Sequence, residues 1–302
     1  MNEYSQPVIL SEDDADRRAI DDLTRQAKAQ SGPMAVLTRA RRDQLKAEVA
    51  AELDFARALR RARLELLDTL EVALQASSPL TVAQMTDEQL LDLILRGGLG
   101  LAIDDFIDQQ DRIREAAEKA LTAVQPDFGF SPIASQIDQI QATSAAGVFD
   151  DVILPDFKAA IRSAISDVSL DVPVDVAMST LNDRLNRSEG KQLTEVKTRI
   201  SQYGRSITAA AASAADLDYY LYTGPQDGIT RPFCQALVGL VVSSKQMGRL
   251  NNGQGLNVLT SCGGYNCRHS WSPVTEGFVE AADLPKAKQA DIFKANRGAR
   301  RR

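Results

Sequence analysis

The residues best suited to chemistry gather in one short stretch of the chain. It contains all three cysteines and the only histidine: Cys234, Cys262, Cys267 and His269. Thiolate and imidazole groups are the usual ligands of structural zinc, and Cys₃His is one of the common ligand sets. If the backbone from Cys267 to His269 is extended, both side chains project to the same face. The pattern therefore predicts one local site, with Zn²⁺ as its candidate cofactor.

Two other interpretations of these residues stay open. The chain has no CxxC pair, so the spacing is not that of a zinc finger, and three reduced thiols can instead pack as small hydrophobic groups. Cys267 and His269 could also form a catalytic nucleophile and base, although residues two apart on a strand rarely make the tight contact this needs. An odd number of cysteines confined to one stretch is not a disulfide framework and indicates a reducing compartment.

Two arginines lie close to these cysteines in the sequence. Arg231 precedes Cys234 by three positions, and Arg268 directly follows Cys267. A guanidinium group is well suited to pair with a carboxylate such as Asp227 or to bind backbone carbonyl groups. We therefore expect both arginines to have a structural role.

The order of these residues forms a composite pattern. It comprises a D-x-x-T-R-x-x-C element, a G-x-V strand at 239–241, a glycine-rich loop at 253–255 and an N-C-R element ahead of a strand that ends at Pro273. The residues of the two named elements are Asp227, Thr230, Arg231, Cys234, Asn266, Cys267 and Arg268. The pattern resembles the C-terminal module of the phage Mu F-like head-morphogenesis family, the minor head or minor capsid proteins. The resemblance covers about residues 190–275.

The resemblance implies a non-enzymatic minor head (capsid) protein of a tailed bacteriophage or prophage. Such a protein is associated with the portal vertex of the virion head, is assembled in the bacterial host cytoplasm and acts in head assembly and DNA packaging or delivery. Its expected partners are the portal protein and other capsid or head proteins, with no small-molecule substrate. The residues alone leave two alternatives, a Cys/His-dependent enzyme and a zinc-stabilised nucleic-acid-binding module.

The elements around the candidate site form a small mixed module. Residues 219–223 are aromatic and β-branched, which predicts a strand, and 237–242 and 265–271 have extended patterns. The chain before residue 218 is rich in Ala and Leu with helical periodicity. The fold class that we expect is mainly α, with long N-terminal helices followed by a small α+β C-terminal module of short antiparallel strands.

The helical part has specific expected boundaries. Residues 34–76 carry an apolar stripe at steps of three and four, with Glu48 among the charged residues on other faces. The stripe fits a bundle core, or alternatively a partner-binding surface. We expect residues 125–147 to be a connector with at most one helical turn. Residues 174–217 form a helical pattern that is broken near Gly190.

Changes in composition divide the chain into four parts. The expected parts are a flexible acidic arm at 1–32, a helical domain at 33–189, the Mu F-like α+β module at 190–275 and a basic tail at 276–302. A transmembrane helix needs about 18 consecutive apolar residues. The sequence contains no such stretch, so we expect no membrane partner. The N-terminus also lacks the pattern of a secretory signal.

Charge sets limits on contacts with nucleic acid. The chain has 35 Lys and Arg residues against 41 Asp and Glu residues, a net charge of −6, so it lacks the broad basic character of a general nucleic-acid coat. The tail differs, because its final stretch is basic. It contacts packaged DNA or an acidic partner surface, or it is a solvated, disordered tail. The candidate DNA contacts are Lys294, Arg297, Arg300, Arg301 and Arg302.

Overall fold

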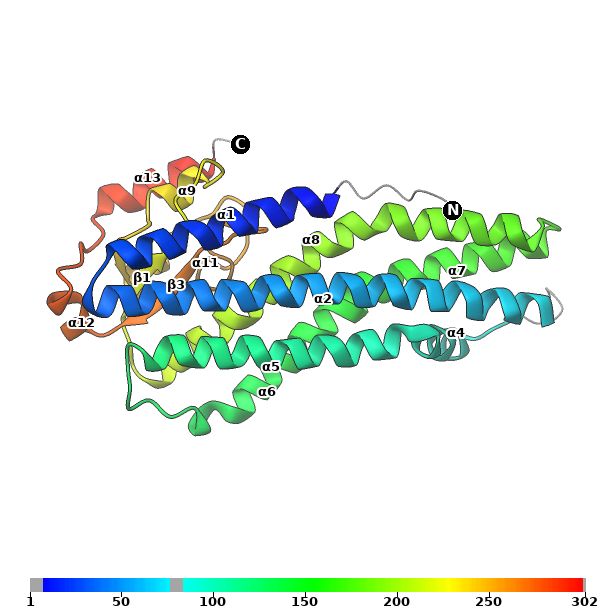
Figure 1. The fold of residues 1–302 in the computed structure, drawn as a ribbon, viewed down its shortest axis with the longest axis horizontal. Coiled ribbons are helices and arrows are strands. Elements are labelled where there is room, and N and C mark those ends of the chain that lie inside the picture. The colour runs from blue at the N-terminus through cyan, green and yellow to red at the C-terminus, as the bar shows by residue number, and fades with distance from the viewer. Residues whose placement is uncertain (1–7, 77–83, 301–302) are drawn as a thin grey trace. The chain divides into compact units, whose positions relative to one another are not determined.

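The computed structural model describes residues 8–76 and 84–300, with side chains from residue 14 onward. The chain is 74% helical, and its C-terminal part contains a three-stranded antiparallel sheet, which confirms the expected fold class. The longer helices are α1 (Val8–Ala29), α2 (Gly32–Ala76), α4 (Asp87–Ile94), α5 (Gly100–Thr122), α6 (Ala134–Val148), α7 (Leu154–Ser169) and α8 (Val174–Ala214), drawn in Figure 1. Among the described residues, no helix has both the length and the apolar character that crossing a membrane requires.

Contacts divide the chain into two compact units. One contains residues 51–109 and 142–199, whose described residues form helices and the turns between them, and we call it the helical unit. The other contains residues 8–50, 110–141 and 200–300, and we call it the module unit. Long helices contribute to both units, so the division is not a simple cut in the sequence.

An aromatic cluster fills part of the core of the helical unit. Phe55, Phe106 and Phe149 meet edge to face, with ring centroids 5.4 to 5.9 Å apart. The apolar stripe of α2 is buried as its period predicts, for example at Leu59, Leu66 and Leu70, where 4% or less of each residue is exposed. Each edge-to-face pair contributes about 0.5–1.5 kcal/mol beyond the burial of apolar area. The cluster therefore favours this pairing of the three segments.

Two helical segments differ from the sequence expectations. Residues 134–148 form α6 where a connector was expected, because Pro132 lies in the first turn of a helix, where its missing N–H costs little. Helix α8 continues through Gly190 without a break. A single glycine lowers helix stability by about 1 kcal/mol, and Arg60 and Arg63 both bind Glu189 beside it, so neighbouring contacts hold this turn.

Residues 8–29 of the expected acidic arm form helix α1. Over the residues whose side chains are described, α1 buries Asp16, Ala19, Leu23 and Ala27 at helical steps of three and four. Ala19 and Leu23 pack against Leu45 of α2. The apolar stripe is difficult to recognise in the sequence because acidic residues lie among its apolar positions.

The sheet of the module unit has the order β2-β1-β3, with both pairs antiparallel. Its strands are β1 (Tyr219–Thr223), β2 (Val241–Ser243) and β3 (Ser270–Val274). Tyr219 pairs with Val274, and Tyr222 pairs with Trp271. Short helices complete the module: α9 (Pro232–Gln235), α10 (Ser244–Met247), α11 (Val258–Ser261), α12 (Glu276–Ala281) and α13 (Gln289–Ala299).

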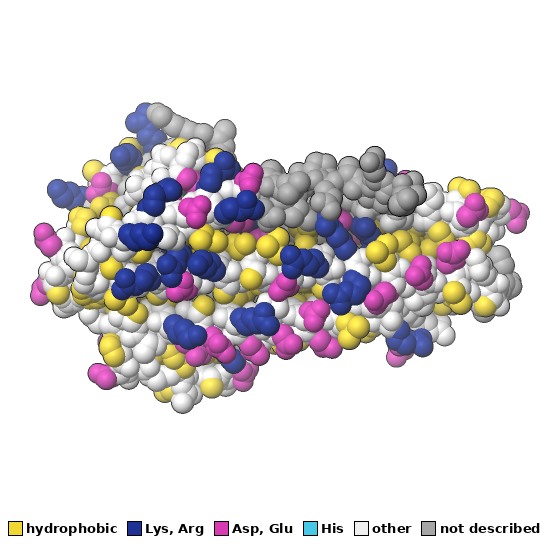
Figure 2. Space-filling model, viewed as in Figure 1, with side chains coloured by type: hydrophobic (Ala, Val, Ile, Leu, Met, Phe, Trp, Pro, Cys, Tyr) yellow, Lys and Arg dark blue, Asp and Glu magenta, His cyan; other side chains and the backbone are white. Residues whose placement is uncertain are grey.

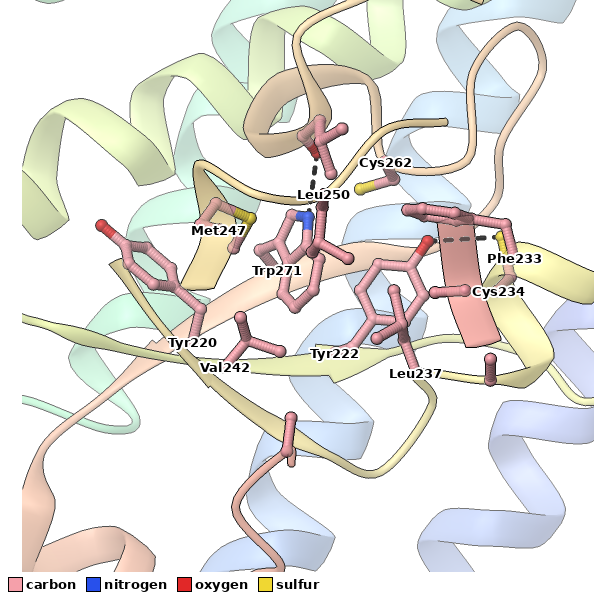
Figure 3. Packing of buried hydrophobic residues seen from close by; sticks show 14 of the residues in the cluster. Tyr220, Tyr222, Phe233, Cys234, Leu237, Val242, Met247, Leu250, Cys262 and Trp271 are labelled. Atoms are coloured by element: carbon pink, nitrogen blue, oxygen red, sulfur yellow. Dashed lines mark hydrogen bonds between the residues drawn. The ribbon is translucent and has the colours of Figure 1, made fainter. Parts of the chain in front are cut away.

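The two faces of β1 pack into two different cores. Tyr220 and Tyr222 belong to a core with Phe233 and Trp271, shown in Figure 3. Leu221, between them, packs on the opposite side with Val241 and other apolar residues. Side chains of a strand alternate between its faces, so a strand that packs into a core on each side needs apolar residues on both faces. This explains why the YYLYT segment has no polar alternation.

Candidate metal centre

The candidate site lies where β1, β3 and the loops around them meet. Cys267 and His269 directly precede β3, and their alternation with Trp271 turns all three to the core that contains Tyr222. Cys234 reaches the same place from α9, on the far side of a turn after β1. Residues separated by more than thirty positions therefore meet through the pairing of two strands.

Three of the four predicted ligands form one cluster. The Sγ atoms of Cys234 and Cys267 are 3.7 Å apart, and Cys267 Sγ is 3.7 Å from Nδ1 of His269. The donor atoms of all three residues lie within 4.8 Å of one another. All three residues are buried, with 5% or less of each exposed.

Cys262 is adjacent to this cluster without being part of it. It is fully buried at the C-terminal end of α11 and belongs to the same core, but it is not among the residues whose donor atoms all lie within 4.8 Å of one another. Its φ of 50° lies in the left-handed region, which is strained for a residue with a side chain. The predicted set of four is thus a close set of three with a neighbouring sulfur.

Aromatic and backbone groups surround the cluster. The Tyr222 hydroxyl donates a hydrogen bond of 3.3 Å to Cys234 Sγ, the dashed line beside Phe233 in Figure 3. The Tyr222 ring stacks on His269 with centroids 5.3 Å apart. The backbone N–H of Gly263 donates to Cys267 Sγ at 3.2 Å. An ideal Cβ at Gly263 would lie 2.5 Å from Cys234 Sγ, so this close approach requires glycine.

The three thiols differ in their pKa. Burial raises the pKa of Cys267, but its polar neighbours, with the hydrogen bond to Cys234 first, outweigh burial and lower the pKa well below the ordinary value for cysteine. The hydrogen bond to Cys267, together with burial, raises the pKa of Cys234. Burial is the largest cause that raises the pKa of Cys262. The lowered pKa is thus that of the central sulfur, and the raised values are those of the two thiols beside it.

The charged residues of the motif bind each other and the loops. Arg268 donates to both carboxylate oxygens of Asp227, at 2.6 and 3.0 Å, and Asp227 also accepts from the Thr230 hydroxyl at 2.9 Å. Arg231 donates to the carbonyl groups of Gly263 and Tyr265, at 3.0 and 2.6 Å. These contacts agree with the structural role that we expected for both arginines.

Asn266, the remaining residue of the motif, has a φ of 53° and makes the turn between Tyr265 and Cys267. Asparagine is among the residues that adopt positive φ most readily. Its position in the motif is therefore explained by the turn that aims Cys267 into the core.

The helices contribute buried charges that the sequence analysis missed. Arg41 of α2 binds Glu48 at 3.1 Å and donates to the carbonyl of Arg268 at 2.9 Å. Arg205 of α8 donates to the carbonyl groups of Cys267 and Thr260. Glu48 is therefore on the buried face of α2, not on another face as expected. The available signal was spacing, because positions 41, 45 and 48 continue one helical stripe.

The basic tail is built into the module unit. Ile292 and Ala295 of α13 are buried, whereas Lys294, Arg297 and Arg300 are exposed on its outer side. Arg301 and Arg302 lie outside the described residues. The position of α13 beside α9 (Figure 1) follows from Gly298, whose ideal Cβ would be 3.0 Å from the Pro232 backbone. The described part of the tail is thus an ordered helix with a basic outer side.

Comparison of the sequence with protein-family models finds no matching family. Comparisons with curated proteins and with solved structures also find no match. The chemistry of the site must therefore be inferred from its own geometry. That geometry offers two thiol groups and one imidazole to a metal ion, or one thiolate beside an imidazole, in both cases under a closed surface.

Proposed function

We propose that the chain is a non-enzymatic minor head protein of a tailed bacteriophage or prophage. In this proposal it is associated with the portal vertex and acts in head assembly and DNA packaging or delivery. The proposal starts from the Mu F-like pattern of residues 227–273. It treats the C-terminal module as a stable architectural element and the long helices as the part that holds portal or capsid subunits.

One observation carries the proposal. The residues of the Mu F-like pattern join two loops and a strand into one partly buried network. Asp227 and Arg268 form a bidentate pair, and Arg231 binds the loop that contains Gly263. A bidentate guanidinium pair is specific in geometry as well as strong, so it suits the locking of loops. Residues that fix loops in place in this way suit the module of a head-assembly protein.

The helical unit has apolar side chains that a larger partner could cover. Leu64 and Val72 of α2 are 56% and 66% exposed, and Leu101 of α5 is 62% exposed. Single exposed apolar residues are common on protein surfaces. A charged residue introduced at one of these three positions would oppose the docking of a partner without disturbing the core of the unit.

The portal ring encoded by the same genome provides the test. The full chain, co-expressed with that portal protein, is expected to co-purify with the ring on a gradient. Val72→Glu is expected to lower the amount of bound chain several-fold. The matched control is Gln75→Glu, which adds the same charge at an exposed position of the same helix and should bind normally. A portal ring that carries none of the wild-type chain would overturn the proposal.

A Cys/His-dependent enzyme is the second candidate, and one specific observation favours it. Cys267 Sγ is 3.7 Å from His269 Nδ1, and hydrogen bonds outweigh burial to lower the pKa of Cys267. A reactive cysteine needs a thiolate, but it also needs access to a substrate. Only 5% of Cys267 and 2% of His269 are exposed, so the module would have to open. Reactivity of Cys267 in the native protein separates this candidate from the first.

A further inference from the structure

The separations within the cysteine cluster match those that one metal ion imposes. A tetrahedral zinc ion with bonds of about 2.3 Å to sulfur and 2.0 Å to nitrogen holds its ligand atoms about 3.5–3.8 Å apart. The distance from Cys234 Sγ to Cys267 Sγ is 3.7 Å, and that from Cys267 Sγ to His269 Nδ1 is also 3.7 Å. These three groups need little movement to bind a common ion.

The orientation of His269 leaves the correct nitrogen for a metal. Its Nε2 atom is 2.9 Å from the carbonyl oxygen of Pro225, and a carbonyl can only accept a hydrogen bond. Nε2 therefore carries the proton, and Nδ1 presents a lone pair toward Cys267. Metal-binding histidines commonly have this arrangement, in which the second nitrogen donates to a carbonyl or carboxylate. The stacked ring of Tyr222 holds the imidazole in this orientation.

The sulfur atoms have the outer contacts that thiolate ligands need. The Gly263 N–H donates to Cys267 Sγ, and the Tyr222 hydroxyl donates to Cys234 Sγ. Hydrogen bonds of this kind stabilise negative charge on sulfur. A set of three thiolates and one neutral imidazole around Zn²⁺ has a net charge of −1. Arg205, fully buried and close to Cys262 and Cys267, supplies the opposite charge.

Cys262 is the natural fourth ligand. It is fully buried in the core that also contains Cys234 and Cys267, so it is the remaining sulfur near the cluster. In Figure 3 it is on a different loop from Cys234, and both side chains lie in the core around Tyr222. Its backbone φ of 50° is strained, and such strain persists where surrounding structure holds a functional position. To act as a ligand, its sulfur must move toward the other three donor atoms, because it lies outside the set that is within 4.8 Å.

We propose that Cys234, Cys262, Cys267 and His269 bind one Zn²⁺ ion as a structural site. The softness of three sulfur ligands with one imidazole favours zinc over calcium or magnesium. Four buried protein ligands leave no open coordination position on the ion. The ion therefore stabilises the module and does not catalyse a reaction. Binding displaces the protons of the neutral thiols, so zinc affinity falls as the pH is lowered. This inference is independent of the proposed function.

The test uses the full chain, purified under reducing conditions without chelator. We expect about one zinc ion per chain, and a chelator should lower the unfolding temperature. Replacement by Co²⁺ should produce a sulfur-to-cobalt charge-transfer band. In Cys262→Ser the intensity of that band should fall by roughly a third, because two thiolates replace three. Cys267→Ser should abolish stoichiometric binding.

Ala236→Ser is the control for placing a hydroxyl in this core, and it should bind zinc normally. The wild-type chain alone keeps the proposal testable if Cys267→Ser does not fold. A wild-type chain with no stoichiometric zinc, no cobalt band and an unfolding temperature that neither zinc nor chelator changes would overturn the site. A band of unchanged intensity in Cys262→Ser would overturn the assignment of the fourth ligand.

Discussion

The Nε2 atom of His269 lies 2.9 Å from the carbonyl oxygen of Pro225, so the opposite ring nitrogen faces the sulfur of Cys267. One backbone carbonyl in the turn after β1 therefore sets the proton position of the only histidine in the chain. The same turn contains Asp227, which binds Arg268. One segment thus both orients the imidazole and carries the acidic partner of the charged pair. Substitutions in it should affect both the His269 orientation and the pair.

Gly263→Ala tests the close packing around the sulfurs. The added methyl group would lie 2.5 Å from Cys234 Sγ and 3.2 Å from Cys267 Sγ, so the cluster must shift. Overpacking of this kind typically costs about 1–3 kcal/mol. Denaturant unfolding should show that loss. Gly228→Ala is the control, because nothing lies within 4 Å of its added Cβ, and equal stability losses in both variants would contradict the packing argument.

Asp227→Asn tests the bidentate pair through its pH dependence. Burial raises the pKa of Asp227, but hydrogen bonds from Arg268 and Thr230 outweigh it, so the folded-state pKa is below the ordinary value. The pair therefore stabilises the fold above the unfolded-state pKa of about 3.9, and this contribution is lost as pH falls through the lower folded value. Loss of a charge-assisted bond should cost the variant about 2 kcal/mol at neutral pH.

Unfolding of wild type and Asp227→Asn between neutral and strongly acidic pH provides the measurement. Their difference in unfolding free energy should be constant above about pH 4 and shrink below it. Asp21→Asn, at an exposed position of α1, is the control and should track the wild type. A difference that is the same at all pH values would mean that the Asp227 charge is not what stabilises the pair.

Arg41 and Glu48 form a buried ion pair whose loss should be strongly non-additive. Their side chains are 1% and 3% exposed, and removal of one partner leaves the other charge buried. Arg41→Met and Glu48→Leu are each expected to cost about 3–5 kcal/mol, and the double variant much less than the sum. A double-mutant cycle measures this. Additive losses would show that the two charges act independently.

Much of the fold was accessible from the sequence because its signals are local. The stripe of α2 and the aromatic segment of β1 each act over a few residues, and the structure has both. Helix α6 and the buried side of α1 were missed because proline, serine and acidic residues dominate their composition. Tertiary contacts such as Leu23 with Leu45 decide those segments, and no short window contains them.

The candidate site divides in the same way. The step of two from Cys267 to His269 predicted a shared face, and their donor atoms are indeed 3.7 Å apart. That Cys234 joins them depends on strand pairing over more than thirty residues, for which composition has no signal. Arg205 is even farther from the site in sequence. The sequence around Arg205 is that of an ordinary Ala-rich helix. Only the fold shows that the Arg205 charge is close to two cysteines.

The basic side of α13 is expected to contact DNA or an acidic partner surface. Deletion of the tail is a poor test, because Gly298 and Ala299 pack against the module. The triple variant Lys294→Gln, Arg297→Gln, Arg300→Gln keeps the helix and removes only exposed charges. If all three contact phosphates, the slope of log affinity against log salt should become shallower by about 2.7.

Duplex DNA binding at several salt concentrations provides that measurement. Lys245→Gln together with Arg249→Gln, at exposed positions elsewhere in the module, is the control for a general loss of positive charge. An unchanged affinity and slope in the triple variant would remove DNA contact from the functions of this helix.

The accessibility of the Cys267 thiol in the native full chain tests most directly whether the cluster is architectural. The measurement is the rate of alkylation at neutral pH, followed by mass mapping of each cysteine. We predict that Cys267 is protected for as long as the protein remains folded, because only 5% of the residue is exposed, and that denaturation makes all three cysteines react. Rapid and selective modification of Cys267 in the folded protein would contradict this account and favour a Cys/His enzyme.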